Sequence, residues 1–130
     1  MSHPFKTAVE SWDFDAIPAL LAEDVVFRSP VAFKPYHGRA MVGAILLGVS
    51  RVFEDFRYER EVGGEGPGVH VLEFKARVGD VDVHGVDILT TGDDGLITEL
   101  TVMVRPLSAA NAVAAAMKVQ FAAIMESPPG

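Results

Sequence analysis

Asp87 is the residue of this chain best suited to chemistry, because it interrupts an apolar run in the stretch DVHGVDILTTGDDGLITEL (82–100). Alternate side chains of a strand share a face, so Asp87 is expected to lie beside Val83 and Leu89. A carboxyl buried among apolar groups has a raised pKa and can donate a hydrogen bond at neutral pH. The alternation also allows a second interpretation, in which Asp87 lies at the mouth of the sheet, exposed or bound to a backbone N–H.

Two other groupings have residue types that could do chemistry. His37 precedes Gly38 at a predicted helix start and is either an acid or base near a pocket, or a loop residue bound to backbone. Ser29 with His37 could form a nucleophile–base pair, although no orienting acid is evident nearby. Asp82 and His84 share a strand face and resemble part of a metal site. A solvated strand edge explains them more simply, so we expect no metal and no cofactor.

The elements that must position these residues follow from two periodicities. Apolar residues recur at helical spacing in the first fifty residues, and the second half changes to the period of two that is typical of strands. Helices followed by a meander of strands and a last helix predict an α+β fold. The predicted elements are helices capped by Ser2 and by Asp13, a short strand ending before Pro30, a helix over 39–53, strands over 56–62, 69–78, 81–91 and 96–105, and a helix over 107–125.

Length, charge and hydropathy restrict the function classes. The 130 residues predict a single domain over 1–126 with a loose tail at 127–130. The net charge is −7 and the basic residues are scattered, so we expect no nucleic-acid partner. Without cysteine there is no disulfide and no thiolate chemistry. No apolar run approaches the ~20 residues of a membrane helix and no signal peptide is evident, so we predict no membrane partner and a cytoplasmic location.

The predicted sheet has apolar residues on both faces. Helices can cover the face that carries Asp87. The opposite face carries Val86, Ile88 and Met103 among polar neighbours, and a small domain has few elements left to cover it. This pattern predicts a homodimer through the sheet face.

The element order and several motifs resemble the nuclear transport factor 2-like superfamily, and within it the SnoaL-like proteins related to ketosteroid isomerase. The motifs are DAIPALLAED before VVFRSP, then HGR at a helix start, then GVDILTTGDDGLI and the closing VMVRP. The resemblance spans about residues 5–106. It implies a cone-shaped fold, with N-terminal helices packed on a curved, mostly antiparallel sheet around a pocket, plus a C-terminal helix.

The resemblance implies that one site residue of the ketosteroid isomerases is retained. Asp87 falls at their oxyanion-hole acid, a carboxyl that an apolar site keeps neutral. Their general base falls at Ser29, and two tyrosines of their oxyanion hole fall at Phe5 and Leu46. Because neither a base nor these donors is present, steroid isomerisation is not expected.

The same comparison does not support two other reactions of the superfamily. Polyketide cyclases and limonene epoxide hydrolases place an acid on the last strand, where this chain has Leu100, Val102 and Val104. What remains is an apolar pocket for a small apolar or amphipathic molecule. Two hypotheses stay open: a cofactor-independent proton-transfer enzyme of isomerase, cyclase or dehydratase type with Asp87 as acid or hydrogen-bond donor, and a non-catalytic ligand-binding or dimerisation domain. For any single aromatic candidate, plain core packing is the simpler interpretation. The predicted lining residues are Trp12, Phe27, Ser29, Phe33, Tyr36, Phe53, Phe74, Val83, Leu100, Val102 and Val104.

Overall fold

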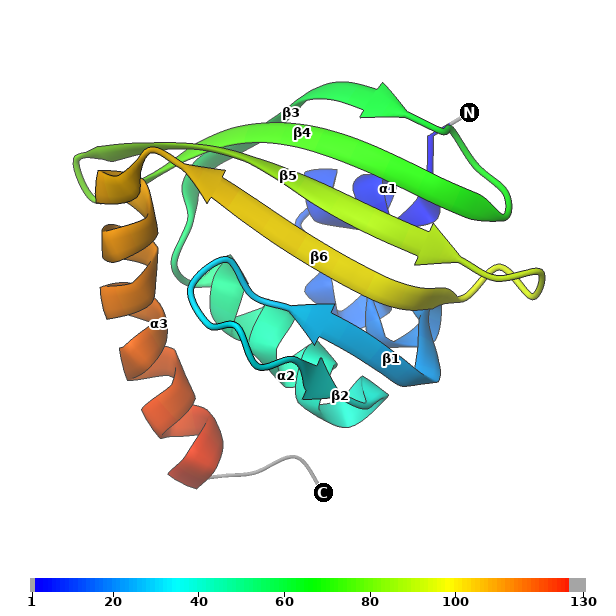
Figure 1. The fold of residues 1–130 in the computed structure, drawn as a ribbon, viewed down its shortest axis with the longest axis horizontal. Coiled ribbons are helices and arrows are strands. Elements are labelled where there is room, and N and C mark those ends of the chain that lie inside the picture. Colours follow the sequence, from blue (N-terminus) through cyan, green and yellow to red (C-terminus); the bar gives the residue numbers. More distant parts are fainter. Residues whose placement is uncertain (1, 127–130) are drawn as a thin grey trace.

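The computed structural model describes residues 2–126, and the tail predicted at 127–130 lies outside the described residues. It confirms the predicted α+β fold, with a six-stranded curved sheet, helices against it and a C-terminal helix (Figure 1). The elements in chain order are α1 (Pro4–Glu10), the 3-10 turns η1 (Phe14–Ala16) and η2 (Pro18–Leu20), β1 (Leu21–Arg28), β2 (Tyr36–His37), α2 (Arg39–Ser50), β3 (Glu54–Val62), β4 (Gly68–Val78), β5 (Val81–Thr91), β6 (Ile97–Arg105) and α3 (Leu107–Glu126).

The sheet has the strand order β2-β1-β6-β5-β4-β3. The strands β3 to β6 form a meander of antiparallel neighbours, and β1 joins its free side by parallel pairing with β6. Figure 1 shows α1 and α2 on one face of this sheet, with α3 crossing one end. The helices α1 and α2 therefore cover one face of the sheet and leave the other face without a helix among the described residues.

The inner face of β5 has the alternation that the sequence predicts. Its buried residues are Val83, Gly85, Asp87, Leu89 and Thr91, and the residues between them are partly or fully exposed. In β6 an irregularity in the pairing with β5 places Ile97 in the core.

The N-terminal region differs from its prediction. The helix predicted after Asp13 is two 3-10 turns instead, and the Asp13 side chain caps neither of them. Pro18 begins the second turn and cannot donate a helical hydrogen bond, so the chain turns into β1 at Leu21. The first helix is capped by His3 rather than Ser2, because the His3 ring accepts the Phe5 N–H.

The two long helices cover the open side of the sheet with small apolar side chains. In α2, Val42, Ile45 and Leu46 are buried at helical spacing, and the helix ends at Ser50, three residues before the predicted end. In α3, Val113 and Met117 are buried one turn apart against the core.

Of the described residues, only α3 is long and apolar enough to cross a membrane by length and composition, with a mean hydropathy of 1.3. The core helix of a water-soluble domain passes the same test, and α3 packs on the sheet and α2 through one face. The predicted cytoplasmic location is not tested by this and stays a prediction.

Gly85 permits the closest packing in the core. A Cβ atom built at Gly85 would lie 2.5 Å from Cζ of Phe74 and 2.6 Å from the carbonyl oxygen of Met103. Both distances are shorter than carbon contacts in proteins, so only glycine lets the Phe74 ring lie flat against β5. Gly85 lies two residues from Asp87 on the same face of β5. The position of the Phe74 ring near Asp87 therefore depends on Gly85.

We expect Gly85→Ala to lower the free energy of unfolding by about 1–3 kcal/mol, because the new methyl group overpacks the core. Urea unfolding followed by circular dichroism measures the change. Gly43→Ala in α2 is the matched control, since its Cβ would make an ordinary 3.5 Å contact with Pro18. Equal stability of Gly85→Ala and the wild type would contradict the close packing described here.

Candidate functional site

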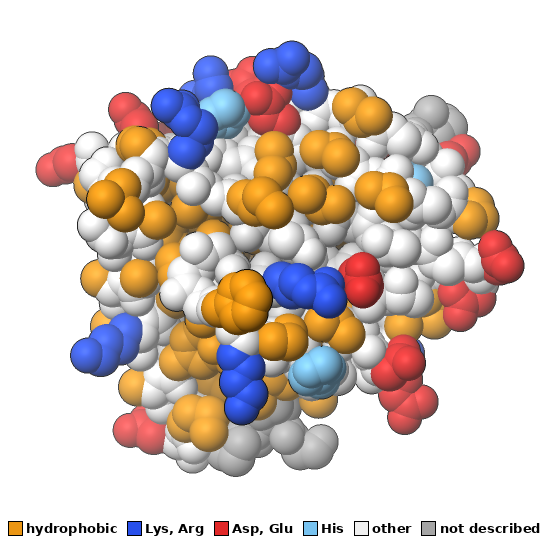
Figure 2. Space-filling view, viewed as in Figure 1, with side chains coloured by type: hydrophobic (Ala, Val, Ile, Leu, Met, Phe, Trp, Pro, Cys, Tyr) orange, Lys and Arg blue, Asp and Glu red, His pale blue; other side chains and the backbone are white. Residues whose placement is uncertain are grey.

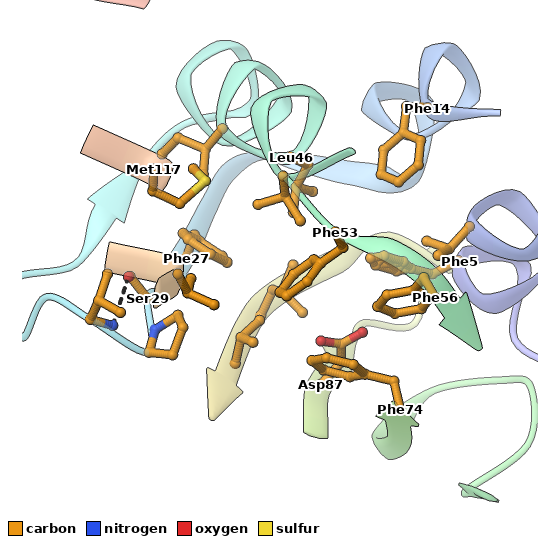
Figure 3. A pocket seen from close by; sticks show the side chains of 18 of the residues that line it. Phe5, Phe14, Phe27, Ser29, Leu46, Phe53, Phe56, Phe74, Asp87 and Met117 are labelled. Atoms are coloured by element: carbon orange, nitrogen blue, oxygen red, sulfur yellow. Dashed lines mark hydrogen bonds between the residues drawn. The ribbon is translucent and has the colours of Figure 1, made fainter. Parts of the chain in front are cut away.

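The candidate site is a cavity of about 60 Å³ between the inner face of the sheet and the helices (Figure 3). Residues from both ends of the chain and from all three helices surround it. Asp87 is the one acidic residue among those that line it, and none of them is basic. The lining residues are Phe5, Val9, Trp12, Phe14, Phe27, Ser29, Pro30, Val31, Ile45, Leu46, Val49, Phe53, Phe56, Tyr58, Phe74, Asp87, Leu100, Val102, Val113, Met117 and Phe121.

Aromatic rings form one wall of the cavity. Phe56 stacks on Phe74 with ring centroids 4.8 Å apart, and Phe53 meets Phe74 edge-on at 5.7 Å. Trp12 extends the wall from Phe56 at 6.1 Å and contacts Phe14 at 4.9 Å. These rings bring apolar surface up to Asp87, so few water molecules can solvate its carboxyl.

Asp87 has one hydrogen-bond donor in this apolar surrounding. The Tyr58 hydroxyl donates to Oδ2 of Asp87 at 2.9 Å. Tyr58 lies on β3, opposite Phe74 of β4, and Phe74 in turn lies opposite Gly85 of β5. The Tyr58 side chain therefore extends past β4 to reach Asp87. The other carboxyl oxygen, Oδ1, has no hydrogen-bond partner among residues 2–126 and is available to a ligand. Figure 3 shows the carboxyl directed from the sheet toward Phe53 and Phe56.

Burial raises the pKa of Asp87 to about 7, and the hydrogen bond from Tyr58 opposes this rise. At neutral pH the carboxyl is therefore present in both its neutral and its ionised form. Burial, and then the negative charge of Asp87, raises the pKa of Tyr58 well above its ordinary value, so the phenol stays a donor. The pair can hold or accept a proton near pH 7.

The structure brings most of the sequence-predicted lining residues together with Asp87. Their role in binding a ligand stays a prediction, since the same rings also pack the core. The predicted residues that line the cavity are Trp12, Phe27, Ser29, Phe53, Phe74, Leu100 and Val102.

Three predicted residues of the region around β2 do not line the cavity. Phe33 is fully exposed, because it lies in the loop between β1 and β2. His37 is exposed on the two-residue strand β2. Tyr36 is half-buried, and its ring stacks on Phe121 at 5.4 Å, so it supports a lining residue from behind.

Val83 and Val104 lie on the inner face of the sheet but outside the cavity. Val83 is buried in the core, and Val104 pairs with Gly85 one step along the ladder from Asp87 and Val102. Sharing a face with Asp87 therefore does not suffice to line the cavity.

The other predicted groupings take different partners. Ser29 Oγ accepts the Val31 N–H at 3.1 Å, drawn as a dashed line in Figure 3, and it forms no hydrogen bond with His37 among the described residues. His84 Nε2 lies 2.7 Å from Glu73 on the neighbouring strand β4. Within residues 2–126, no three His, Cys, Asp or Glu residues are grouped as a metal site would need.

Tyr58, which hydrogen-bonds to Asp87, is absent from the predicted site residues. Its signal was present, because Phe56 and Tyr58 alternate on one strand face and both line the cavity. Two residues of α1, Phe5 and Val9, were also absent from the predicted lining, although they lie at helical spacing.

We expect Asp87→Asn to make the protein more stable at high pH. The folded state keeps the Asp87 proton up to about pH 7, whereas the unfolded chain releases it near 3.8, so the wild type loses stability as the pH rises between these values. The gain is up to about 4 kcal/mol at pH 9 and near zero at low pH, at about 1.4 kcal/mol per pKa unit. Urea unfolding at pH 4 and pH 9 measures it.

Asp82→Asn is the matched control, because Asp82 is exposed on the same strand. A gain for Asp87→Asn that is independent of pH would contradict a neutral buried carboxyl.

Comparison with known proteins agrees with this geometry. The model of the SnoaL-like domain matches residues 5–100. A search of curated proteins finds no match. Among solved structures, the chain is similar to a steroid delta-isomerase from Pseudomonas aeruginosa, with 40% identity and a TM-score of 0.86 over 95% of this chain and 90% of that one.

Two further structures extend the comparison. An uncharacterised protein with a cystatin-like fold from Silicibacter pomeroyi is 37% identical, with a TM-score of 0.87 over 95% of this chain and 92% of that one. An epoxide hydrolase/cyclase-like enzyme of pyran ring formation in salinomycin is 18% identical, with a TM-score of 0.63 over 78% of this chain and 84% of that one, and this likeness shows the fold alone. The chain belongs to the SnoaL-like domain family, and it shares its fold with NTF2-like proteins.

Proposed function

We propose that the cavity binds a small, largely apolar molecule with a carbonyl oxygen and that Asp87 transfers a proton within it, as in an isomerase. The observation that carries the proposal is the buried carboxyl of Asp87, bound by Tyr58 at 2.9 Å and otherwise surrounded by apolar side chains. The steroid delta-isomerase that is 40% identical to this chain shares its fold, which supports the class of chemistry.

A single carboxyl can carry both halves of an isomerisation. Ionised Asp87 accepts a proton from a carbon next to the ligand carbonyl, and the C–H electron pair moves into an enolate. Neutral Asp87 then returns the proton to another carbon of the same molecule, so no proton is gained or lost. A pKa near 7 suits both steps, because both forms are populated at neutral pH.

The residues around Asp87 restrict the ligand. Phe5 and Leu46 line the cavity and provide no hydrogen-bond donor to a second ligand oxygen. The free space of about 60 Å³ is well below the ~300–1,000 Å³ of ordinary ligand sites. A ligand of a few heavy atoms fits the space as it is, whereas a steroid requires the lining to move.

Conversion of 3-cyclohexen-1-one to 2-cyclohexen-1-one tests the proposal, because conjugation gives an absorbance change. We expect Asp87→Asn to lower kcat at least 100-fold, the usual loss for a removed acid–base group. Tyr58→Phe removes the hydrogen bond that lowers the pKa of Asp87, so the rise of kcat/KM with pH is expected to shift to higher pH.

Asp82→Asn serves as the control, since it removes a carboxylate from the exposed side of the same strand. Binding of the product ketone is measured separately by NMR titration. Binding without turnover, or turnover that survives Asp87→Asn, would reject proton transfer and favour the alternative of a non-catalytic ligand-binding domain.

We also infer that the outer face of the sheet binds a second copy of the chain. Val86 and Met103 pair across β5 and β6, and Ile88 pairs with Val71 across β5 and β4, on the face that no helix covers. Figure 2 shows hydrophobic side chains gathered over the sheet beside a group of charged side chains of both signs. A face with this mixture suits an isologous interface.

Light scattering is expected to give twice the chain mass of 14.0 kDa at micromolar concentration. Met103→Glu places a charge in the interface and is expected to give monomers. Val119→Glu is the control, because Val119 is an exposed apolar residue of α3. A monomeric wild type would contradict the interface.

A further inference from the structure

Two histidines are buried together where α1 begins. The His3 and His70 side chains are 2% and 1% exposed, and their ring centroids lie 4.7 Å apart. His3 precedes α1, and His70 belongs to β4. This cluster lies outside the candidate site and takes no part in the proposed reaction.

The hydrogen bonds of His3 require a neutral ring. Nδ1 accepts the Phe5 N–H at 3.0 Å, so Nδ1 carries no proton. Nε2 then carries the proton and donates it to Oγ1 of Thr91 at 3.0 Å, on β5. The backbone N–H of His3 donates to Glu61 of β3 at 2.8 Å. His3 thus attaches the start of α1 to two strands, and a second ring proton would break the cap at Phe5.

The hydrogen bonds of His70 also fit a neutral ring. Nε2 lies 2.8 Å from the carbonyl oxygen of Gly66, so Nε2 is the donor. Nδ1 is buried and has no partner among the described residues. This side of the His70 ring therefore offers no hydrogen bond to His3. Protonation of the His3 ring is unfavourable while α1 is in place, because it would cost the bond from the Phe5 N–H in a buried setting.

The helix that this cluster attaches is also part of the cavity wall. Phe5 and Val9 of α1 line the cavity, and Trp12 continues the lining after the helix. Trp12 has a left-handed backbone with φ of 57°, which ends α1 in a tight turn. If the start of α1 detaches from β3 and β5, the cavity is open on that side.

We propose that His3, packed against His70, forms a pH-dependent latch that holds α1 over the cavity when the His3 ring is neutral and releases it on protonation. The latch concerns access to the cavity and depends on the proposed function only in treating the cavity as a ligand site. It explains how a ligand larger than the free space of about 60 Å³ could enter.

The groups around His3 have opposite effects on the protonation of its ring. Glu61 favours a positive His3, since its carboxylate accepts the His3 N–H. Lys6 on α1 pairs with Glu10 at 3.0 Å, and Glu65 in the β3–β4 turn is exposed. Burial, followed by the nearby imidazole, lowers the pKa of His3 below 6.5 despite Glu61. The state with α1 attached thus binds fewer protons than the state with α1 released. The free-energy difference that favours attachment therefore shrinks as the pH falls below 6.5.

Hydrogen exchange of the ligand-free protein at pH 7.5 and 5.5 tests the latch. After correction for intrinsic rates, we expect the amides of residues 6–10 to exchange at least tenfold faster at pH 5.5, while those of β4 and β5 stay protected.

His3→Asn keeps an acceptor for the Phe5 N–H but cannot titrate, so it is expected to remove most of the pH dependence. His37→Asn changes an exposed histidine and is the control. Thr91→Val removes the acceptor for His3 Nε2 and is expected to speed exchange of α1 already at pH 7.5.

Three results would overturn the latch. They are exchange of α1 that does not change with pH, the same pH dependence in His3→Asn and the wild type, and loss of protection in β4 and β5 together with α1. Because these measurements contain no ligand, their outcome is independent of whether Asp87 transfers a proton.

Discussion

The carboxyl of Asp87 lies in an apolar interior where the Tyr58 hydroxyl is its hydrogen-bond donor, and the arrangement of the site follows from that contact. Apolar surroundings favour the neutral acid and the phenol favours the carboxylate, so the two effects bring the pKa close to neutrality. The rings of Phe56 and Phe74 maintain this balance by excluding water, and Gly85 leaves the room that Phe74 needs. A site with one titrating group thus depends on packing as much as on charge.

Much of the fold and part of the candidate site could be predicted from the sequence, because alternation along a strand shows which residues share a face of the sheet. Periodicity places Asp87 on one face with Val83 and Leu89, whereas the pocket and its aromatic lining are predicted from the family resemblance. Periodicity does not tell which residues of different strands meet, and that is why Tyr58 was missed. Phe33 shows the converse, since an aromatic residue beside a strand carries no pattern that distinguishes an exposed loop from a pocket wall. The 3-10 turns after Asp13 show how Pro18 outweighs helical spacing.

Access to the cavity and the protonation of its acid respond to the same variable. As the pH falls below neutrality, Asp87 becomes neutral, and the imidazole of His3 approaches the range in which α1 loses its attachment. At higher pH the acid is ionised beneath a closed wall. The proposed latch would therefore favour entry of ligand while the site holds its proton and closure when the site can accept one.

The parallel pairing of β1 with β6 affects the order in which the chain folds. The meander of β3 to β6 consists of neighbours in sequence and can form locally, whereas Phe27 must find Leu100 across most of the chain. The helices α1 and α3, from opposite ends, then complete the walls. The cavity is accordingly among the last parts to exist during folding, and a ligand present at that stage could be enclosed without passing through any entrance.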